Sequence, residues 1–416
     1  MNYSETLNYI FSLKTVSLKP SLDRINAALN ELGNPQNFLK AIHIAGTNGK
    51  GSVASMIAEI LKSTGKNVGL FISPYIIEFT ERIQINGIYI NKNDLCHFSE
   101  KVASLQPKLA ERGLELGQFE FITAVAFLYF KEQNCDYVVL ETGLGGRFDA
   151  TNVISNPICT VITKISYDHT AILGDTLKQI AGEKAGIIKH STPCVTWDQH
   201  SEAMDVITDK CADSLAPMSI VDPKNISNVR LSLTGTAFKY KNQEFFTTLC
   251  GAHQAENASL AIETINYLGD PFSYEIINKG LREVKHPCRI EAFGENRSVI
   301  IDGAHNPDGA RSLAAFLKTI NFKGDMIFGG MKDKNLYDVA NILSPFASRV
   351  ITVTVKNNPR AQKSEELKSI FLNYIDNVVA AESYDEALKL VEGNSALICG
   401  SLYLAADMRR YFDKTN

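Results

Sequence analysis

Residues 46 to 52 read Gly-Thr-Asn-Gly-Lys-Gly-Ser, a combination of residue types that suits phosphate binding. Glycines allow successive backbone N–H groups to turn toward one anion. Lys50 has the position from which an ammonium group reaches terminal phosphates, and Ser52 offers a hydroxyl for Mg²⁺. The general phosphate-loop pattern has a glycine at position 44 and a hydroxyl at position 51, where this chain has Ile44 and Gly51. The segment therefore predicts a variant phosphate loop.

Three further polar residues each follow a continuous apolar run that predicts a buried strand: Ser73, Glu141 and His169. Ligands of open α/β sheets bind at the carboxyl ends of the strands, and a carboxylate at such an end suits a nucleotide–Mg²⁺ site. Each residue also has an ordinary alternative. Ser73 precedes Pro74 and suits a turn, Glu141 is compatible with a mere strand end, and a lone histidine is usually a surface or core group.

The elements that must position these residues follow from hydrophobic periodicity. Apolar residues recur on one helical face over residues 53–61, directly after the predicted phosphate loop. The same periodicity predicts two helices within residues 1–40, and the apolar run at 121–130 predicts a buried helix. Asn86 and Gly87 predict the turn of a hairpin. Residues 190–250 predict strands and turns with no evident chemistry.

The length of 416 residues exceeds the roughly 250–300 residues at which one core usually splits, which predicts two domains. We expect an α/β protein with a larger P-loop ATPase-like domain at 1–287, built on a mostly parallel sheet. We expect a smaller Rossmann-like α/β domain at 288–416, where strands and helices alternate again. The second domain has no G-x-G-x-x-G motif, which argues against dinucleotide binding.

Composition excludes several classes of protein. Apolar residues make up 45% of the chain and charged residues 21%, as in ordinary soluble globular proteins. The net charge of −4 gives no electrostatic basis for binding nucleic acid. The N-terminus lacks the pattern of a secretory signal, and no apolar run approaches the roughly 20 residues that span a bilayer. Eight scattered cysteines without a C-x-x-C pair predict buried, reduced thiols. We therefore expect a cytoplasmic protein with no membrane partner.

Taken in order, the motifs resemble those of the folylpolyglutamate synthases and dihydrofolate synthases, within the ATP-dependent Mur ligase superfamily. The resemblance covers nearly the whole chain. The blocks that carry it are 43–52, 71–74, 141–152, 168–169, 181–187, 253–257, 302–307 and 400–404. In this family the phosphate loop has the variant form seen here.

The resemblance implies roles for individual residues. It assigns ATP binding to Gly46, Thr47, Asn48, Gly49, Lys50, Gly51 and Ser52, and to Asn257, Arg289, Asp302 and His305 across a domain cleft. It implies two Mg²⁺ ions, one held by Ser52, Ser73 and Glu141 and the other by His169. Lys184 matches a lysine that the family carbamylates, which replaces a cation that would repel Mg²⁺ with a carboxylate-like group. Lys50, His169 and Lys184 are thus the candidate catalytic residues.

The reaction implied by the resemblance is amide ligation. A folate carboxylate attacks the γ-phosphate of ATP to give an acyl phosphate and ADP, and the amino group of L-glutamate then displaces phosphate. Catalysis of this kind depends on positioning and on neutralising phosphate charge. The resemblance places the folate against Arg24 in the loop 19–24, Phe119 and Asp149. A loop-capping aspartate is the plain alternative for Asp149.

Several functional alternatives stay open. The enzyme could act as a folylpolyglutamate synthase, as a dihydrofolate synthase on dihydropteroate only, or as both. Gly117 stands where many relatives have a threonine, and this departure favours polyglutamylation slightly. The blocks 143–147 and 400–403 argue against a peptidoglycan ligase. A nucleotide-dependent binding module without ligase activity would not need the acid, histidine and lysine motifs. We expect a monomer that binds only small-molecule substrates: ATP, L-glutamate, and a folate or dihydropteroate.

Overall fold

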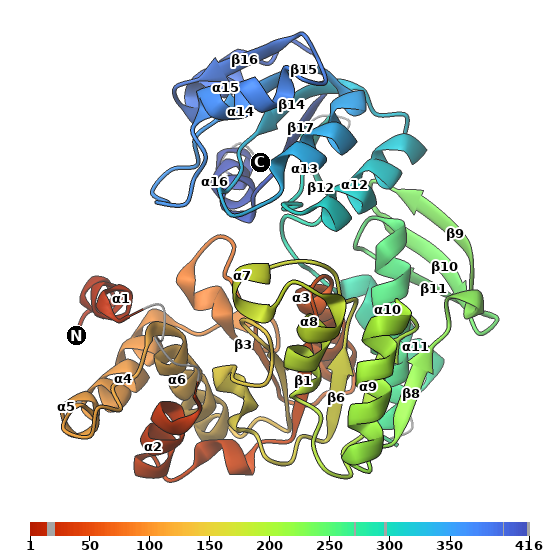
Figure 1. Ribbon diagram of the computed structural model, residues 1–416. Helices are drawn as coiled ribbons and strands as arrows, with labels where there is room; N and C mark the ends of the chain where they lie inside the picture. The colour runs from red at the N-terminus through yellow and green to blue at the C-terminus, as the bar shows by residue number, and fades with distance from the viewer. Residues whose placement is uncertain (15–20, 270–271, 295–297, 394, 414–416) are drawn as a thin grey trace. The chain divides into compact units, whose positions relative to one another are not determined.

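The structure is a computed structural model (Figure 1). It describes residues 1–14, 21–269, 272–294, 298–393 and 395–413. The chain forms two compact units: Met1–Lys224 with Asn257–Glu283, and Asn225–Glu256 with Val284–Asn416. Each unit is built on a mainly parallel sheet with helices, so the predicted two-domain α/β architecture is confirmed.

The division differs from the predicted one in two stretches, residues 225–256 and 284–287. The predicted boundary at residues 287 and 288 lies close to the passage from Glu283 to Val284, but residues 225–256 group with the second unit. Leu231 and Leu233 pack against the same apolar core as Ile290, which explains this grouping. Such long-range burial is not visible in local periodicity. That residues 287 and 288 separate an ATP-binding domain from a second functional domain stays a prediction.

An eight-stranded sheet forms the centre of the first unit, in the order β4-β3-β2-β5-β1-β6-β7-β8. Six neighbouring strands of this sheet are parallel: β2, β5, β1, β6, β7 and β8. Strands β3 and β4 form an antiparallel hairpin at one edge, next to β2. Asn86 and Gly87, both with positive φ, make its turn, which confirms the predicted hairpin. The strands are β1 (Ala41–Ala45), β2 (Val68–Phe71), β3 (Ile83–Ile85), β4 (Ile88–Tyr89), β5 (Tyr137–Glu141), β6 (Cys159–Ile162), β7 (Cys194–Trp197) and β8 (Met218–Val221).

Helices accompany this sheet along the chain. They are α1 (Tyr3–Ser12), α2 (Asp23–Glu31), α3 (Lys50–Lys62), α4 (Lys92–Ala103), α5 (Gln106–Ala110), α6 (Gln118–Glu132), α7 (Thr170–Leu173), α8 (Leu177–Ala185), α9 (Ser201–Asp213), α10 (Ala252–Tyr267) and α11 (Tyr274–Glu283). The prediction of only strands and turns over 190–250 was wrong at α9. Its buried residues Ala203, Ile207 and Cys211 recur every four positions, but polar residues between them hide the pattern.

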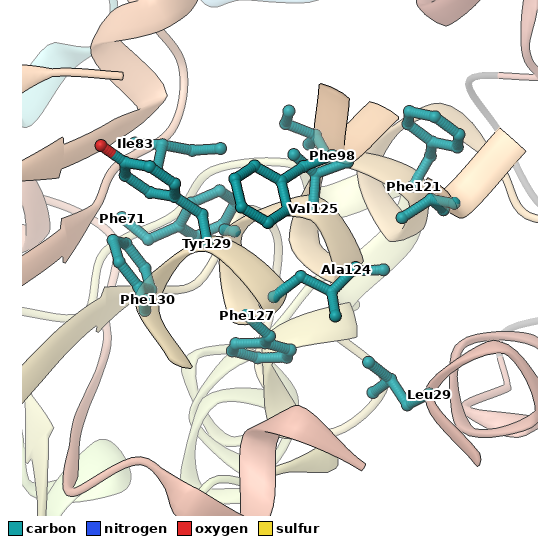
Figure 2. Close-up of a cluster of buried hydrophobic side chains, with 14 of the residues drawn as sticks. Leu29, Phe71, Ile83, Phe98, Phe121, Ala124, Val125, Phe127, Tyr129 and Phe130 are labelled. Carbon is teal, nitrogen blue, oxygen red and sulfur yellow. The ribbon is translucent and has the colours of Figure 1, made fainter. Parts of the chain in front are cut away.

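The main core of the first unit combines aliphatic side chains with several aromatic ones (Figure 2). Figure 2 shows Phe127 and Phe130 of the buried helix α6 with Phe71 of β2 and Leu29 of α2 in one cluster. The ring of Phe98 from α4 packs edge-on against Tyr129, with centroids 5.5 Å apart. Burying several such side chains, each worth roughly 1.5–3 kcal/mol of transfer free energy, fixes α6 and its N-terminal residues against the sheet.

The second unit contains two sheets. A six-stranded sheet has the order β12-β13-β17-β14-β15-β16, with only β12 antiparallel, and a three-stranded antiparallel sheet has the order β11-β10-β9. The strands are β9 (Ile226–Ser232), β10 (Gly235–Tyr240), β11 (Gln243–Thr247), β12 (Glu291–Phe293), β13 (Val299–Ile301), β14 (Gly324–Phe328), β15 (Ala347–Val353), β16 (Val378–Ala381) and β17 (Ala396–Cys399). The helices are α12 (Pro307–Thr319), α13 (Leu336–Leu343), α14 (Ser364–Phe371), α15 (Tyr384–Lys389) and α16 (Leu402–Asp413).

The strand order of the first unit brings four chain segments to one edge. Strand β1 lies between β5 and β6, with Ile44 opposite Glu141 and Ala45 opposite Ile162. Strand β2 lies on the far side of β5. Because all four strands are parallel, the segments that follow their carboxyl ends are neighbours, which is where an open α/β sheet binds ligands.

Candidate active site

The phosphate loop follows β1 and ends at α3, as predicted. Gly46 and Gly49 have φ of 153° and 88°, values that favour glycine. A Cβ atom at Gly46 would lie 1.8 Å from Oγ1 of Thr163, so this position also has no room for a side chain. The loop is anchored to the segment after β6, because the backbone N–H groups of Thr47 and Asn48 donate to the carbonyl oxygen of Lys164 at 2.9 and 3.2 Å.

Two lysines meet at the start of this loop. Lys50 Nζ donates to the carbonyl oxygens of Gly46 and Thr47 at 3.1 and 3.2 Å. Lys184 Nζ, from α8, donates to the same Gly46 oxygen at 2.7 Å. Lys184 is buried, which together with the charge of Lys50 lowers its pKa to about 7. Lys184 is therefore a buried group and not a solvated surface lysine.

Ser73 and Glu141 lie side by side at the carboxyl ends of β2 and β5. The backbone N–H of Ser73 donates to Glu141 Oε2 at 3.1 Å, and the Glu141 side chain is buried. Arg82 donates to Ser73 Oγ at 3.0 Å and lies over the Tyr75 ring. A hydroxyl and a carboxylate are the oxygen donors that Mg²⁺ prefers. The structure thus brings together two of the predicted metal ligands.

The segment after β6 reaches the phosphate loop from the other side. Thr47 Oγ1 donates to the carbonyl oxygen of Ser166, and the Ser166 N–H donates back to Thr47 Oγ1, both at 3.0 Å. His169 follows three residues later with φ of 51°, and its N–H donates to Asp168 Oδ1 at 2.9 Å. Its side chain is 38% exposed, so the ring remains accessible to a ligand.

Asn257 joins the same loop from a distant part of the chain. A Cβ atom built on Gly49 would lie 2.4 Å from Asn257 Oδ1, which places the carboxamide directly against the loop. Ser52, in the first turn of α3, is buried. Across the described ranges of the chain, no three His, Cys, Asp or Glu side chains gather as a metal site.

Two of the predicted folate residues, Phe119 and Asp149, lie against Gly143. A Cβ atom at Gly143 would lie 2.6 Å from the Phe119 ring, whose centroid is 5.9 Å from that of Phe71. Arg24 pairs with Glu120, its Nε lying 3.0 and 3.1 Å from the two carboxylate oxygens. Residues 15–20, which include positions 19 and 20 of the predicted loop 19–24, lie outside the described residues.

Asp149 is buried and hydrogen-bonded to its own loop. Oδ2 accepts from the N–H groups of Gly143 and Leu144, both at 2.9 Å. Oδ1 accepts from the Thr151 N–H at 3.1 Å and from Thr151 Oγ1 at 2.5 Å. Burial raises the pKa of Asp149, while these donors lower it. With four bonds already made, the carboxylate favours the loop-holding alternative, and a direct folate contact stays a prediction.

The remaining predicted nucleotide residues lie together in the second unit. Asp302 follows β13, is buried, and accepts from the N–H groups of Ile290 and Ala304 at 2.9 and 2.7 Å. Burial raises its pKa, and the charge of Arg289 opposes this shift. The His305 Nδ1–H donates to the Gly303 carbonyl oxygen at 3.0 Å.

Sequence reasoning did not assign a role to His43, which lies within β1 and is fully buried. Its Nε2 is 2.7 Å from Thr151 Oγ1. The sequence did contain a signal for such a role, namely a polar imidazole within an otherwise apolar predicted strand. A buried polar group normally has a hydrogen-bond partner, so a specific contact was to be expected.

Family models match most of the chain. The Mur ligase middle domain matches residues 44–265, and the Mur ligase glutamate ligase domain matches residues 288–402. The dihydrofolate synthase/folylpolyglutamate synthase of Bacillus subtilis is 37% identical over 98% of both chains. This chain belongs to the Mur ligase family, in its folylpolyglutamate and dihydrofolate synthase group.

Solved structures resemble this Mur ligase over almost their whole length. Folylpolyglutamate synthase from Mycobacterium tuberculosis complexed with ADP has a TM-score of 0.91 at 29% identity and covers 99% of this chain and 98% of its own. An FPGS–AMPPCP–folate complex has a TM-score of 0.83 at 32% identity, covering 99% of each. None of the helices in the described parts of this Mur ligase has the length and apolar character needed to cross a membrane.

Proposed function

We propose that this Mur ligase uses ATP to attach L-glutamate to a folate, acting as a tetrahydrofolylpolyglutamate synthase and also as a dihydrofolate synthase. The observation that carries the proposal is the convergence on Gly46 of Lys50 and Lys184, beside Ser73 and Glu141 at the same sheet edge. Relatives named for these two activities support the choice of substrates.

The phosphate loop and Lys50 bind the ATP phosphates. Lys50 contacts carbonyl oxygens of its own loop in this structure, and bound phosphate offers its ammonium group a stronger, charged acceptor. The helix α3 begins at Lys50, so its N-terminal N–H groups face the same anion. Asn257, Arg289, Asp302 and His305 are proposed to contact the rest of the nucleotide.

Mg²⁺ fits the oxygen donors present. Ser52, Ser73 and Glu141 would hold one ion, and His169 a second. The ions would neutralise charge on the transferred phosphoryl group. The chain's own contribution is to hold the folate carboxylate in line with the γ-phosphate, so that an acyl phosphate forms and the glutamate amine displaces phosphate from it. Water exclusion protects the acyl phosphate until the amine arrives.

Lys184 is suited to carbamylation. A pKa of about 7 leaves a substantial fraction of the amine neutral near neutral pH. The neutral amine attacks CO₂, a C–N bond forms, and one proton is released to solvent, which leaves a carbamate anion. Protein incubated with ¹³C-bicarbonate is expected to show one carbamate carbon resonance, absent in Lys184→Met. A spectrum identical in both proteins would contradict this assignment.

The folate is proposed to lie near Phe119 and Gly143, with Arg24 and Asp149 on the same side of the first unit. The Phe119 ring gives an apolar surface for an aromatic ring system. Arg24 is held in place by its ion pair with Glu120. We propose that it borders the folate pocket and contacts the bound folate.

The decisive experiment incubates the purified full chain with ATP, Mg²⁺ and L-glutamate, and with dihydropteroate or tetrahydrofolate. A glutamylated product from both acceptors, with one ADP released per amide, is expected. Product from dihydropteroate alone would leave only dihydrofolate synthase activity. Nucleotide binding without any amide product would support a nucleotide-dependent binding module instead. We also propose a monomeric, cytoplasmic enzyme, which gel filtration and cell fractionation test.

A further inference from the structure

A buried chain of hydrogen bonds links the strand before the phosphate loop to the segment after Glu141. It runs from His43 through Thr151 to Asp149, and from there to the N–H groups of Gly143 and Leu144. His43, Thr151 and Asp149 are buried, and none of the three is among the residues predicted to bind the nucleotide.

The direction of each hydrogen bond follows from the groups present. Three backbone N–H groups and the Thr151 hydroxyl point at the two oxygens of the Asp149 carboxyl group, so Asp149 is the acceptor in all four hydrogen bonds. The Thr151 hydroxyl therefore gives its single hydrogen to Asp149 Oδ1. Its oxygen must then accept from His43 Nε2, so the imidazole carries its proton on Nε2.

Burial holds the His43 imidazole in its neutral state. Burial lowers its pKa to about 3, and the nearby charge of Lys189 acts in the same direction. Near pH 7 the imidazole is therefore neutral and donates to Thr151 through Nε2–H. An apolar residue would fill the strand position without the cost of burying a polar ring.

The loop that this chain holds is fixed at its other end as well. The Arg147 N–H donates to the Glu183 carbonyl oxygen at 2.7 Å, and Asn152 Nδ2 donates to the Gly186 carbonyl oxygen at 3.2 Å. These carbonyls flank Lys184 at the end of α8. The segment 143–152 is thus clamped between β1, through His43, and the helix that carries Lys184.

We propose that His43 is a positioning residue for the folate side of the ligation site, acting through Thr151 and Asp149 on Gly143 and Leu144. The expected effect of His43 on activity rests on the proposed ligase function. His43 does not contact the nucleotide or the folate in this role. It sets the position of the backbone against which Phe119 packs.

The test uses two carboxamides of different reach. In His43→Gln the amide nitrogen extends about as far as Nε2 and restores the donor to Thr151. In His43→Asn it corresponds to Nδ1 and falls short. We expect His43→Asn to raise the KM for the folate roughly 5–30-fold, the equivalent of one lost hydrogen bond, with the KM for ATP within about twofold. His43→Gln should stay within about threefold of the unaltered protein.

Hydrogen exchange supplies a readout that does not need activity. The amides of Gly143 and Leu144 should exchange faster in His43→Asn than in the unaltered protein, and His43→Gln should restore their protection. Ile42→Val is the matched control, because it removes a buried methyl group from the same strand without touching the chain of hydrogen bonds.

Unchanged exchange and folate KM in His43→Asn, or a His43→Gln variant no better than His43→Asn, would overturn the inference. Equal loss in Ile42→Val would also overturn it, since the effect would then come from strand stability alone. If the unaltered protein makes no amide product, the proposed function fails, and the exchange comparison still decides the role of His43.

Discussion

The ammonium groups of Lys50 and Lys184 share one acceptor, the carbonyl oxygen of Gly46, at 3.1 and 2.7 Å. Two like charges at one oxygen repel each other, and the buried partner bears the larger cost because it is removed from water. Phosphate binding would draw Lys50 away, and loss of the Lys184 charge would relieve the repulsion directly. The pair therefore links nucleotide binding to the protonation state of Lys184.

The stability of the protein should reflect this buried lysine. The Lys184 pKa is about 7 in the folded chain and 10.5 in an exposed lysine. Between these values the unfolded state binds a proton that the folded state lacks, so the free energy of unfolding rises with pH. Below pH 7 both states are protonated and the cost of burial is fully present.

Lys184→Met should therefore be more stable than the unaltered protein at pH 6, by roughly 2–4 kcal/mol, with the difference shrinking toward pH 9. Urea unfolding at several pH values in CO₂-free buffer without nucleotide measures it. Parallel stability curves for the two proteins would show that Lys184 does not titrate in this range.

Removal of the Lys50 ammonium group should stop ligation. In Lys50→Ala the loop keeps its N–H groups but loses the cation nearest the terminal phosphates, so kcat/KM should fall by more than about 100-fold. Lys66→Ala removes an exposed lysine just beyond α3 and should stay close to normal. Near-normal ligation in Lys50→Ala would exclude the loop from the reaction.

Glu141 should determine the Mg²⁺ requirement. Glu141→Gln keeps the size of the side chain and an oxygen near the Ser73 N–H but removes the negative charge. The Mg²⁺ concentration for half-maximal rate should rise at least about tenfold. Glu132→Gln, at the exposed end of α6, serves as the control. The same Mg²⁺ dependence in both variants would place the ion elsewhere.

The sequence predicted best where short segments decide the structure. The phosphate loop needs only a strand, two glycines with positive φ and a helix, all within residues 41–62. The neighbouring positions of Ser73 and Glu141 could be predicted from the strand pattern, because the carboxyl ends of parallel strands lie at one edge of a sheet. The resemblance then identified the chemistry, which neither periodicity nor spacing could supply.

What escaped sequence reasoning depends on contacts between distant side chains. The burial of Lys184 against Gly46, 138 positions away, decides its pKa but leaves no local pattern. The four hydrogen bonds of Asp149 likewise arise from loop geometry. Residues 225–256 have ordinary strand patterns, and only the core they help to cover assigns them to the second unit.

The close approach of Phe119 to Gly143 gives a separate test of the folate side. In Gly143→Ala the new methyl carbon would lie 2.6 Å from the ring, so the ring or the loop must move. Gly182→Ala is the matched control, because its Cβ would meet nothing closer than an Arg147 nitrogen at 3.9 Å.

We expect Gly143→Ala to raise the KM for the folate at least about tenfold while nucleotide affinity changes by less than about twofold, because the new methyl group meets the Phe119 ring and no residue of the phosphate loop. Gly182→Ala should leave both parameters unchanged and raise the melting temperature slightly, since alanine favours a helix. Steady-state kinetics and titration with a fluorescent ADP analogue measure the two effects. An equal loss of ADP affinity in Gly143→Ala would mean that this loop serves the nucleotide rather than the folate.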